Sequence, residues 1–381
     1  MNKMSTENIF KATQNCTDLW SYLSQSPKNI VMYGMGNGAD KILSVCDRYG
    51  IEVEDFFASD GFVRGHSFHG KTVLSYSDVK AKYGADNIIV LLSFASSLPD
   101  VLENIYKIAD ECELYAPDVP VFGNTLFTKE FFTENYEKFI QTESLLADEE
   151  SVRIFREIIA YKLSGDISHL RLCESDPAEA LENILHAENF EVYVDLGAYN
   201  GDTIRSLLPY SPRLKTVHAM EPDARNFRKL NEYYASLETP SFELKSYNVG
   251  AWSSEDTLYF DKSGNRNAGL LQNSSDFSES INARNKKITE IAVNSLDNIL
   301  GGESVDYIKY DVEGSEYEAL IGSKKTIEKF APALLVSLYH RSEDLFELPQ
   351  LVHKLNPNYK LYLRRMTYIP AWDINLYAVK K

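Results

Sequence analysis

The segment VYVDLGAYNGDT at residues 192–203 constrains the fold more than any other, because an apolar stretch runs directly into an acid and two glycines. Its first three residues favour a buried strand, which would end at Asp195. Gly197 and Gly201 let the backbone approach a ligand where a Cβ would interfere. A helix is then expected to begin near Thr203, with its free N–H groups facing the ligand. The pattern predicts a cofactor-binding loop at the carboxyl edge of a doubly wound α/β sheet.

The next predicted strand, at residues 216–222, ends on a second carboxylate. Glu221 closes this strand, and Pro222 cannot continue its hydrogen-bond ladder. The acid stands about 20 residues beyond the glycine loop, which is the spacing of a ribose-binding acid in dinucleotide folds. A carboxylate can accept hydrogen bonds from both ribose hydroxyls at once. The alternative is a solvated Glu at a strand end, and the preceding glycine loop favours the ribose.

Two further strand ends follow in order. The segment SYNVGAW at residues 246–252 is a short loop that carries an aromatic side chain. The segment YIKYDVEGSE at residues 307–316 is a strand followed by carboxylates. Because the carboxyl ends of parallel strands share one edge of a sheet, these four strand ends predict one ligand-binding crevice.

With these motifs the chain resembles the FkbM-type S-adenosylmethionine-dependent methyltransferases. The resemblance spans residues 125–381 and rests on these motifs, in the family's order: VDLGAYNGDT (194–203), AMEPDARNFRKL (219–230), NVGAWSS (248–254), YIKYDVEGSEYEAL (307–320), VSLYHRSEDLFELPQLV (336–352) and YKLYLRR (359–365). It implies a class I, Rossmann-like methyltransferase fold: a mostly parallel, doubly wound sheet with helices on both faces and an antiparallel strand near its end. It also implies S-adenosylmethionine as the methyl donor and a hydroxyl group of a carbohydrate or glycosylated small molecule as the acceptor.

The resemblance also implies which residues bind the cofactor. They are Asp195, Gly197, Ala198, Tyr199, Asn200, Gly201, Thr203, Glu221, Pro222, Asn248, Gly250, Ala251, Trp252 and Asp311. The glycine loop would lie along the methionine portion, Glu221 at the ribose, and residues 248–252 near the adenine.

Two residues at strand ends are the candidates for catalysis. Residues 333–339 are predicted to form a strand, and His340 follows it, while Asp311 ends the neighbouring strand. A neutral imidazole can accept the proton of an attacking hydroxyl, and a carboxylate can orient the ring. The alternatives are a structural histidine, and helix-capping roles for Asp311, Glu313 and Glu316, of which we favour capping for Glu316 only. Asp311, Glu313 and His340 also form a possible ligand set for a divalent ion, but the prediction includes no metal.

Composition narrows the class of partner. The formal net charge of −17 argues against a nucleic-acid substrate, because an acidic surface repels phosphate backbones. Four scattered cysteines without a C-x-x-C motif argue against a disulfide framework or a zinc site. The first residues lack an apolar signal core, and no apolar stretch approaches the length of about 20 residues that a membrane helix needs. We therefore expect a cytoplasmic enzyme with a small-molecule or carbohydrate substrate and no membrane span.

The N-terminal part contains a second strand–glycine–helix pattern. The segment NIVMYGMGNGAD at residues 29–40 places Gly34, Gly36 and Ala39 in a G-x-G-x-x-A spacing, and Asp60 follows at the end of the next predicted strand. One interpretation is a tight turn with close helix packing. A second is a nucleotide-sugar site, since this part resembles the N-terminal Rossmann-like domain of sugar O-acyltransferases. A third is a redox dinucleotide site.

The predicted organisation has three parts. Residues 1–124 form a Rossmann-like α/β domain that begins with a short helix, residues 125–185 a helical connector packed on both domains, and residues 186–381 the methyltransferase domain. The polar stretch 261–285 is predicted to be a loop, either a surface excursion or a lid over the cofactor. Two other functions stay open: a non-catalytic nucleotide- or nucleotide-sugar-binding protein, and an NAD-linked oxidoreductase that uses the N-terminal glycine loop.

Overall fold

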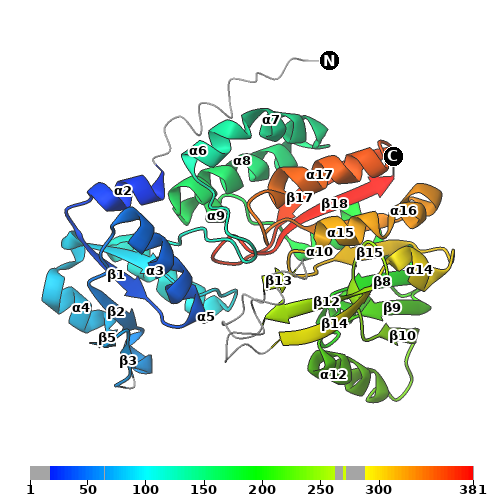
Figure 1. Ribbon diagram of the computed structural model, residues 1–381, viewed down its shortest axis with the longest axis horizontal. Helices are drawn as coiled ribbons and strands as arrows, with labels where there is room; N and C mark the ends of the chain where they lie inside the picture. Colours follow the sequence, from blue (N-terminus) through cyan, green and yellow to red (C-terminus); the bar gives the residue numbers. More distant parts are fainter. Residues whose placement is uncertain (1–17, 64, 262–268, 272–287, 381) are drawn as a thin grey trace.

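The computed structural model describes residues 18–63, 65–261, 269–271 and 288–380. It contains two α/β units on either side of a group of helices, with the N-terminal unit drawn in blue and the C-terminal unit in green to red (Figure 1). No helix of the described residues is long and apolar enough to span a membrane. Within those residues, Cys46, Cys112 and Cys173 are free thiols.

The N-terminal unit is built on a five-stranded parallel sheet of order β5-β2-β1-β6-β7. Its β6 strand is buried at every position because Ile88–Leu92 is a continuous apolar run, as expected for a strand covered on both faces. The strands are β1 (Asn29–Tyr33), β2 (Asp55–Ala58), β5 (Leu74–Ser75), β6 (Ile88–Leu92) and β7 (Glu113–Tyr115), and the helices are α3 (Asn37–Tyr49), α4 (Tyr76–Tyr83) and α5 (Pro99–Glu111). A short hairpin, β3 (Ser67–Phe68) with β4 (Lys71–Thr72), follows β2.

A group of helices lies between the two units, and we call it the connector. They are α6 (Lys129–Glu134), α7 (Tyr136–Leu145), α8 (Glu149–Ser164) and α9 (Ser168–Arg171), and α2 (Leu19–Gln25) precedes the first sheet. Asn135 separates α6 from α7, and α8 ends at Gly165, whose φ of +67° is the left-handed conformation typical of a helix end. One hydrophobic core includes Val90 of β6, Phe139 of α7 and Val194 of the second sheet, so the connector packs on both units.

The C-terminal unit is built on a seven-stranded sheet of order β10-β9-β8-β15-β16-β18-β17. Its strands are β8 (Val192–Leu196), β9 (Thr216–Met220), β10 (Glu243–Tyr247), β15 (Tyr307–Tyr310), β16 (Ala333–Ser337), β17 (Tyr359–Arg365) and β18 (Ile374–Lys380). All neighbours are parallel except β18, which is antiparallel to both β16 and β17. The helices are α10 (Pro177–Glu179), α11 (Asp202–Leu207), α12 (Ala224–Ala235), α14 (Leu296–Leu300), α15 (Glu316–Ile321), α16 (Lys324–Phe330) and α17 (Asp344–Leu355). This is the mostly parallel sheet with a late antiparallel strand that the resemblance implies.

A small four-stranded sheet beside the main one was absent from the sequence-based prediction. It consists of β11 (Gly250–Ala251), β14 (Ile288–Asn294), β12 (Asp256–Asp261) and β13 (Gly269–Leu271), in that order. The last of these strands falls within the stretch 261–285, which we predicted to be entirely a loop. Most of that stretch, and with it the predicted lid, lies outside the described residues.

The two units meet at the carboxyl edge of the second sheet. Ser96 and Ile369 form an antiparallel bridge, and the N–H of Phe122 donates to the carbonyl of His340 over 2.8 Å. A Cβ on Gly314 would lie 2.7 Å from the Phe122 ring, so the ring packs directly on that backbone. The segment that leaves the first unit therefore packs on the loop after β15.

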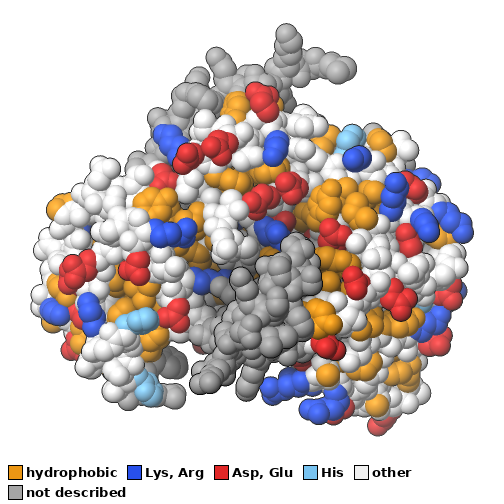
Figure 2. Space-filling model, viewed as in Figure 1, with side chains coloured by type: hydrophobic (Ala, Val, Ile, Leu, Met, Phe, Trp, Pro, Cys, Tyr) orange, Lys and Arg blue, Asp and Glu red, His pale blue; other side chains and the backbone are white. Residues whose placement is uncertain are grey.

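Charged groups of both signs are mixed on the face of the molecule shown in Figure 2, where Lys and Arg side chains stand among Asp and Glu side chains. The described part of this face carries no continuous basic surface. This distribution agrees with the net charge of −17.

Candidate functional site

The first group of the site connects the ends of two strands, β8 and β15, through one buried lysine. Asp195, at the end of β8, is fully buried and accepts a hydrogen bond of 2.5 Å from the Thr203 hydroxyl at the start of α11. Lys309 on β15 lies between two carboxylates, with its Nζ 3.5 Å from Asp195 Oδ1 and 3.4 Å from Asp311 Oδ2. β15 pairs with β8 in a register that sets Lys309 opposite Asp195.

Charge balance explains why this lysine is tolerated in the interior. Burial lowers the pKa of Lys309, but the charges of Asp195 and Asp311 outweigh it, and the pKa is raised above its ordinary value. Burial raises the pKa of Asp311, but the cations Lys309 and His340 outweigh that effect, so this carboxyl stays ionised. Asp195 therefore orders the loop and the lysine, and its side chain is occupied by protein groups.

The glycines of the loop pack closely against neighbouring parts of the protein. A Cβ on Gly197, whose φ is +86°, would lie 1.9 Å from the carbonyl oxygen of Asp311. A Cβ on Gly201 would lie 3.0 Å from Leu230 and Tyr233 of α12. The missing side chains make room for the loop after β15 and for α12, because the loop that contains Gly197 and Gly201 is pressed between these elements.

The second group surrounds Glu221 at the end of β9. One of its carboxylate oxygens accepts the N–H of Tyr199 and the other the N–H of Asp223, both over 2.8 Å. The amide of Asn248 donates to the carbonyl of Glu221 over 2.8 Å and so holds the strand end from the other side. Burial raises the pKa of Glu221 to about 7, against the opposing effect of the two backbone donors.

The remaining predicted cofactor residues lie around these two groups. Tyr199 has a positive φ of 46° and an exposed ring, while Asn200 accepts a hydrogen bond from Arg205. Gly250 and Ala251 form β11, which pairs with β14, and the Trp252 N–H donates to the carbonyl of Asn294. Ala198 is fully buried, and Pro222 lies 3.7 Å from the position of a Cβ on Gly250. The two loops after β8 and β10 thus flank Glu221.

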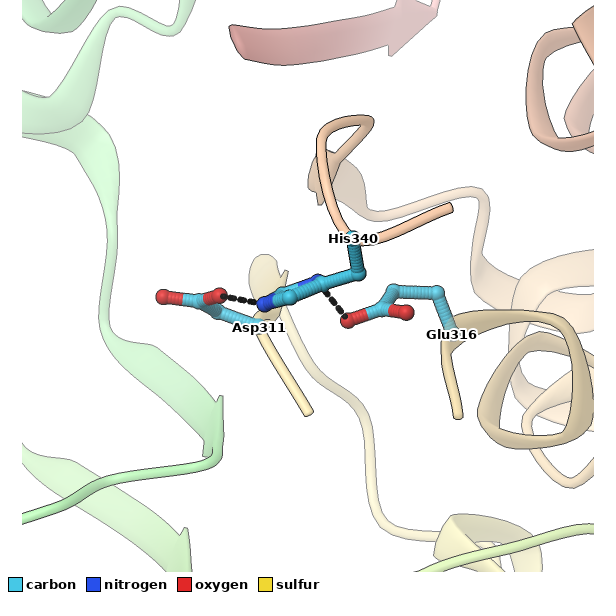
Figure 3. A group of neighbouring side chains, drawn as sticks. All are labelled: Asp311, Glu316 and His340. Atoms are coloured by element: carbon cyan, nitrogen blue, oxygen red, sulfur yellow. Dashed lines mark ion pairs between the residues drawn. The ribbon is translucent and has the colours of Figure 1, made fainter. Parts of the chain in front are cut away.

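The third group is centred on His340, which is fully buried after β16. Its imidazole lies between two carboxylates (Figure 3), with Nδ1 2.9 Å from Glu316 Oε1 and Nε2 3.7 Å from Asp311 Oδ1. A third carboxylate, Glu313 Oε2, also lies 3.7 Å from Nε2. Asp311, Glu316 and His340 are close enough to one another to form a metal-binding group.

The carboxylates around His340 change the pKa of its imidazole, and this bears on its predicted role as a base. Burial lowers its pKa, but Glu316 and the neighbouring acids outweigh burial and raise the pKa to about 9. The ring by itself therefore holds its proton near neutral pH, whereas a base must be neutral. Of the predicted pair, Asp311 is the group that is free to accept a proton.

The structure adds three residues to this site that the sequence did not single out in these roles. Lys309 joins Asp195 to Asp311, and the Tyr339 hydroxyl donates to Asp311 Oδ1 over 2.9 Å. Glu316, predicted as a capping residue, does accept the N–H of Val312 over 2.9 Å, but the same oxygen contacts His340. One feature of the sequence could have pointed to Lys309: it is a lysine within an apolar strand, two residues before the acid at the strand end.

The predicted N-terminal ligand loop is at the carboxyl edge of the first sheet. Gly34 and Gly36 have positive φ values of 112° and 95°, and Ala39 is buried on α3. The closest packing is at Gly38, where a Cβ would lie 2.0 Å from the carbonyl oxygen of Ser93. Asp60 accepts the N–H and the hydroxyl of Ser77, over 3.0 and 2.7 Å, and so holds the start of α4.

A cavity opens beside this loop. Its volume is about 640 Å³, and its lining includes Tyr33 at the end of β1, Ser59 and Asp60 after β2, and Asn104 on α5. The Tyr33 hydroxyl contacts Ser59 Oγ over 2.5 Å and accepts a hydrogen bond of 2.8 Å from the Asn104 amide. The cavity at the edge of the first sheet is therefore lined by these neutral polar groups together with the charged side chains of Asp60, Asp100 and Lys107.

Comparison with known proteins agrees with this geometry. Residues 195–369 match the family model described as the methyltransferase FkbM domain. A crystal structure of methyltransferase FkbM from Methylobacillus flagellatus KT is similar over 97% of this chain and 93% of that chain, with a TM-score of 0.68 and 20% sequence identity. No curated protein sequence matches the chain.

A weaker similarity covers about half of the chain. An rRNA methylase from Streptococcus thermophilus has a TM-score of 0.33 and 15% identity, and the match covers 54% of this chain and 97% of that one. A similarity of that size carries no functional argument. The strand order and the similarity to the M. flagellatus structure show a class I methyltransferase fold, within which residues 195–369 match the FkbM domain model.

Proposed function

We propose that the protein is an S-adenosylmethionine-dependent O-methyltransferase that acts on a hydroxyl group of a carbohydrate or glycosylated small molecule. One observation carries the proposal: Glu221 and Asp311 stand at strand ends on either side of β8, where a doubly wound sheet binds its ligand. Glu221 has the position of a ribose-binding acid, and Asp311 lies beside the strand end where the acceptor would meet the methyl group.

The residues around Glu221 fit the cofactor. Two backbone N–H groups hold its carboxylate in a fixed orientation, and each oxygen keeps a second acceptor site for a ribose hydroxyl. The exposed ring of Tyr199 and the backbone of residues 200–203 border the same loop, beside which the methionine portion would lie. Residues 248–252, on the other side of Glu221, border the adenine position.

Methyl transfer requires mainly that the acceptor oxygen, the methyl carbon and the sulfonium lie in line. As the oxygen–carbon bond forms, the carbon–sulfur bond breaks, its electron pair stays on sulfur, and the hydroxyl proton passes to a base. We assign this proton to Asp311, which Lys309 and the Tyr339 hydroxyl hold in place. His340, beside Asp311, orients that carboxylate.

The hydroxyl acceptor rests on the resemblance of the motifs at residues 194–203, 307–320 and 336–352 to FkbM-type enzymes, whose known members mostly methylate sugars or natural products. A neutral hydroxyl needs a proton acceptor beside it, and an ionised carboxylate such as Asp311 meets that requirement. Transfer of a labelled methyl group to a panel of mono- and oligosaccharides and their glycosides is the direct test of this acceptor class.

Calorimetric titration with S-adenosylhomocysteine tests the cofactor. We expect micromolar or tighter binding by the wild-type protein and a loss of about 1–3 kcal/mol, the scale of a charge-assisted hydrogen bond, in Glu221→Ala. Asp60→Ala, which removes the corresponding acid of the first sheet, is the matched control and should bind as the wild type does. Failure to bind S-adenosylhomocysteine, or binding of NAD⁺ instead, would refute the proposal and favour the dinucleotide alternative.

A second function is proposed for the N-terminal unit. The cavity of about 640 Å³ at the ends of β1 and β2 has room for a small polar ligand, and its lining offers hydroxyl and amide groups. We propose a nucleotide-sugar as its ligand, in line with the resemblance to sugar O-acyltransferases. Titration with UDP-sugars, with an Asn104→Leu variant as the control for the cavity, tests this assignment.

A further inference from the structure

The surroundings of the His340 ring are those of a metal ligand. The residue is fully buried, and its Nε2 has no hydrogen-bond partner among the described residues. Nε2 faces Asp311 Oδ1 and Glu313 Oε2, each 3.7 Å away. Ligand atoms bound to one ion at about 2.0–2.3 Å are separated from each other by about 3–4 Å, so both distances suit atoms that share an ion.

Glu316 supports His340 from the opposite side of the ring. Its Oε1 lies 2.9 Å from Nδ1, and the same oxygen accepts the N–H of Val312 over 2.9 Å, which ties the carboxylate to the backbone. Figure 3 shows the imidazole between Glu316 and Asp311. A histidine that binds a metal commonly directs its other nitrogen to such a carboxylate, which sets the tautomer and aims the free nitrogen at the ion.

The carboxylates of Asp311 and Glu313 are suited to binding a metal ion in different ways. Asp311 Oδ1 already accepts the Tyr339 hydroxyl over 2.9 Å and retains a second acceptor site. Glu313 has a side chain that is 85% exposed and a backbone φ of +55°, an uncommon conformation for a residue other than glycine. Because its side chain is exposed, Glu313 is free to adjust to an ion beside His340.

We infer that His340 Nε2, Asp311 and Glu313 form a binding site for a divalent transition-metal ion, with Glu316 as the residue that positions His340. One imidazole and two carboxylates are intermediate between the oxygen-only sets of Mg²⁺ and the nitrogen- and sulfur-rich sets of Zn²⁺, which favours Mn²⁺. An ion there supplies Lewis acidity to an acceptor hydroxyl. That use rests on the proposed function, whereas binding of the ion does not.

The test is titration of chelator-treated protein with Mn²⁺, followed by the electron paramagnetic resonance signal of the free ion. We expect one Mn²⁺ per wild-type chain, binding at least tenfold weaker in Glu313→Gln, 10- to 100-fold weaker in Glu316→Gln, and none in His340→Gln. Glu328→Gln changes an exposed acid on α16 that pairs with Lys324 and should bind as the wild type does. Because Glu313 is exposed, its variant is expected to fold, which thermal unfolding of each sample verifies.

Two results would overturn the inference: no Mn²⁺ bound by folded wild-type protein, or equal affinity in the wild type, Glu313→Gln and His340→Gln. Calorimetry with S-adenosylhomocysteine in the presence of the chelator separates this outcome from failure of the proposed function. Cofactor binding without Mn²⁺ binding removes only the metal site. Mn²⁺ binding without cofactor binding removes only the proposed methyltransferase function.

Discussion

The two sheets of this protein carry the same local pattern and differ in what surrounds it. In each, a strand leads through glycines into a helix, and the next strand ends at an acid, Asp60 in the first sheet and Glu221 in the second. Asp60 is exposed and caps the start of α4. Glu221 is buried, and the adjoining strand ends add the buried side chains of Asp195, Lys309 and His340.

This difference indicates that the candidate catalytic site is at the second sheet. Burying charged groups costs several kcal/mol for each ion unless neighbouring charges offset it. The first sheet avoids that cost at its carboxyl edge, where the hydroxyls and amide of Tyr33, Ser59 and Asn104 line a cavity. At the carboxyl edge of the second sheet, charged side chains are buried and paired with opposite charges that offset the cost. Such buried charge pairs are typical of a catalytic site.

The largest expected effect distinguishes the two glycine loops. Gly197→Ala would set a Cβ 1.9 Å from the backbone of Asp311, whereas Gly36→Ala would meet nothing within 4 Å. We expect Gly197→Ala to lower the free energy of unfolding by more than about 5 kcal/mol, or to prevent folding. Gly36→Ala should cost about 1–3 kcal/mol, because its φ of 95° and ψ of −156° fall in a region that is essentially restricted to glycine. Urea unfolding measures both, and equal losses would mean that the second loop is not closely packed.

The next effect distinguishes a buried cation from an exposed one. Lys309→Met would leave Asp195 and Asp311 without their shared cation, and we expect a loss of about 3–5 kcal/mol in the free energy of unfolding. Lys82→Met in the first unit removes the exposed partner of Asp55, which keeps the Tyr83 hydroxyl as a donor. Lys82→Met should lower the free energy of unfolding by far less than Lys309→Met. Similar midpoints of thermal unfolding for the two variants would contradict the proposed role of Lys309.

Replacement of one tyrosine in each unit should give a smaller difference in stability. The Tyr339 hydroxyl donates to the ionised Asp311, and the Tyr33 hydroxyl bonds only to neutral groups. Hydrogen bonds to charged groups contribute more to stability, so we expect about 2 kcal/mol for Tyr339→Phe and about 1 kcal/mol for Tyr33→Phe. Chemical denaturation of the two variants under one set of conditions provides the measurement. A larger loss for Tyr33→Phe would reverse the comparison.

The smallest effect concerns pH. Burial raises the pKa of Glu221 to about 7, so the carboxyl of the free protein takes up a proton as the pH falls below that value. Ribose hydroxyls donate best to the ionised form, and cofactor binding must then expel the proton. We expect the dissociation constant for S-adenosylhomocysteine to rise by up to about tenfold for each pH unit below about 7.

Calorimetry between pH 5.5 and 8.5 follows this dependence. Glu221→Gln cannot titrate and should show a flat profile, whereas Asp60→Asn should keep the wild-type profile, since that acid lies in the other sheet. A sloping profile in Glu221→Gln would assign the proton to another group.

Much of the backbone followed from the sequence. The predicted strands that end at Asp195 and Glu221 correspond to β8 and β9, and the two glycine loops lie where the patterns placed them. Apolar runs, glycines and strand-end acids act locally, so a single chain segment is sufficient to reveal them. The sheet of β11 to β14 was missed, because β11 and β13 have only 2 and 3 residues and the paired strands β12 and β14 are far apart in the sequence.

Residue identities alone determined that the chain has two strand–glycine–helix units and that acids stand at the ends of their second strands. Only the tertiary structure decided that Lys309 lies between Asp195 and Asp311, and that His340 lies between Asp311 and Glu316. Lys309 and Asp195 are 114 positions apart in the chain. Because the interaction of two charges depends on their separation and on the surrounding dielectric, folding rather than sequence spacing sets the electrostatics of the site.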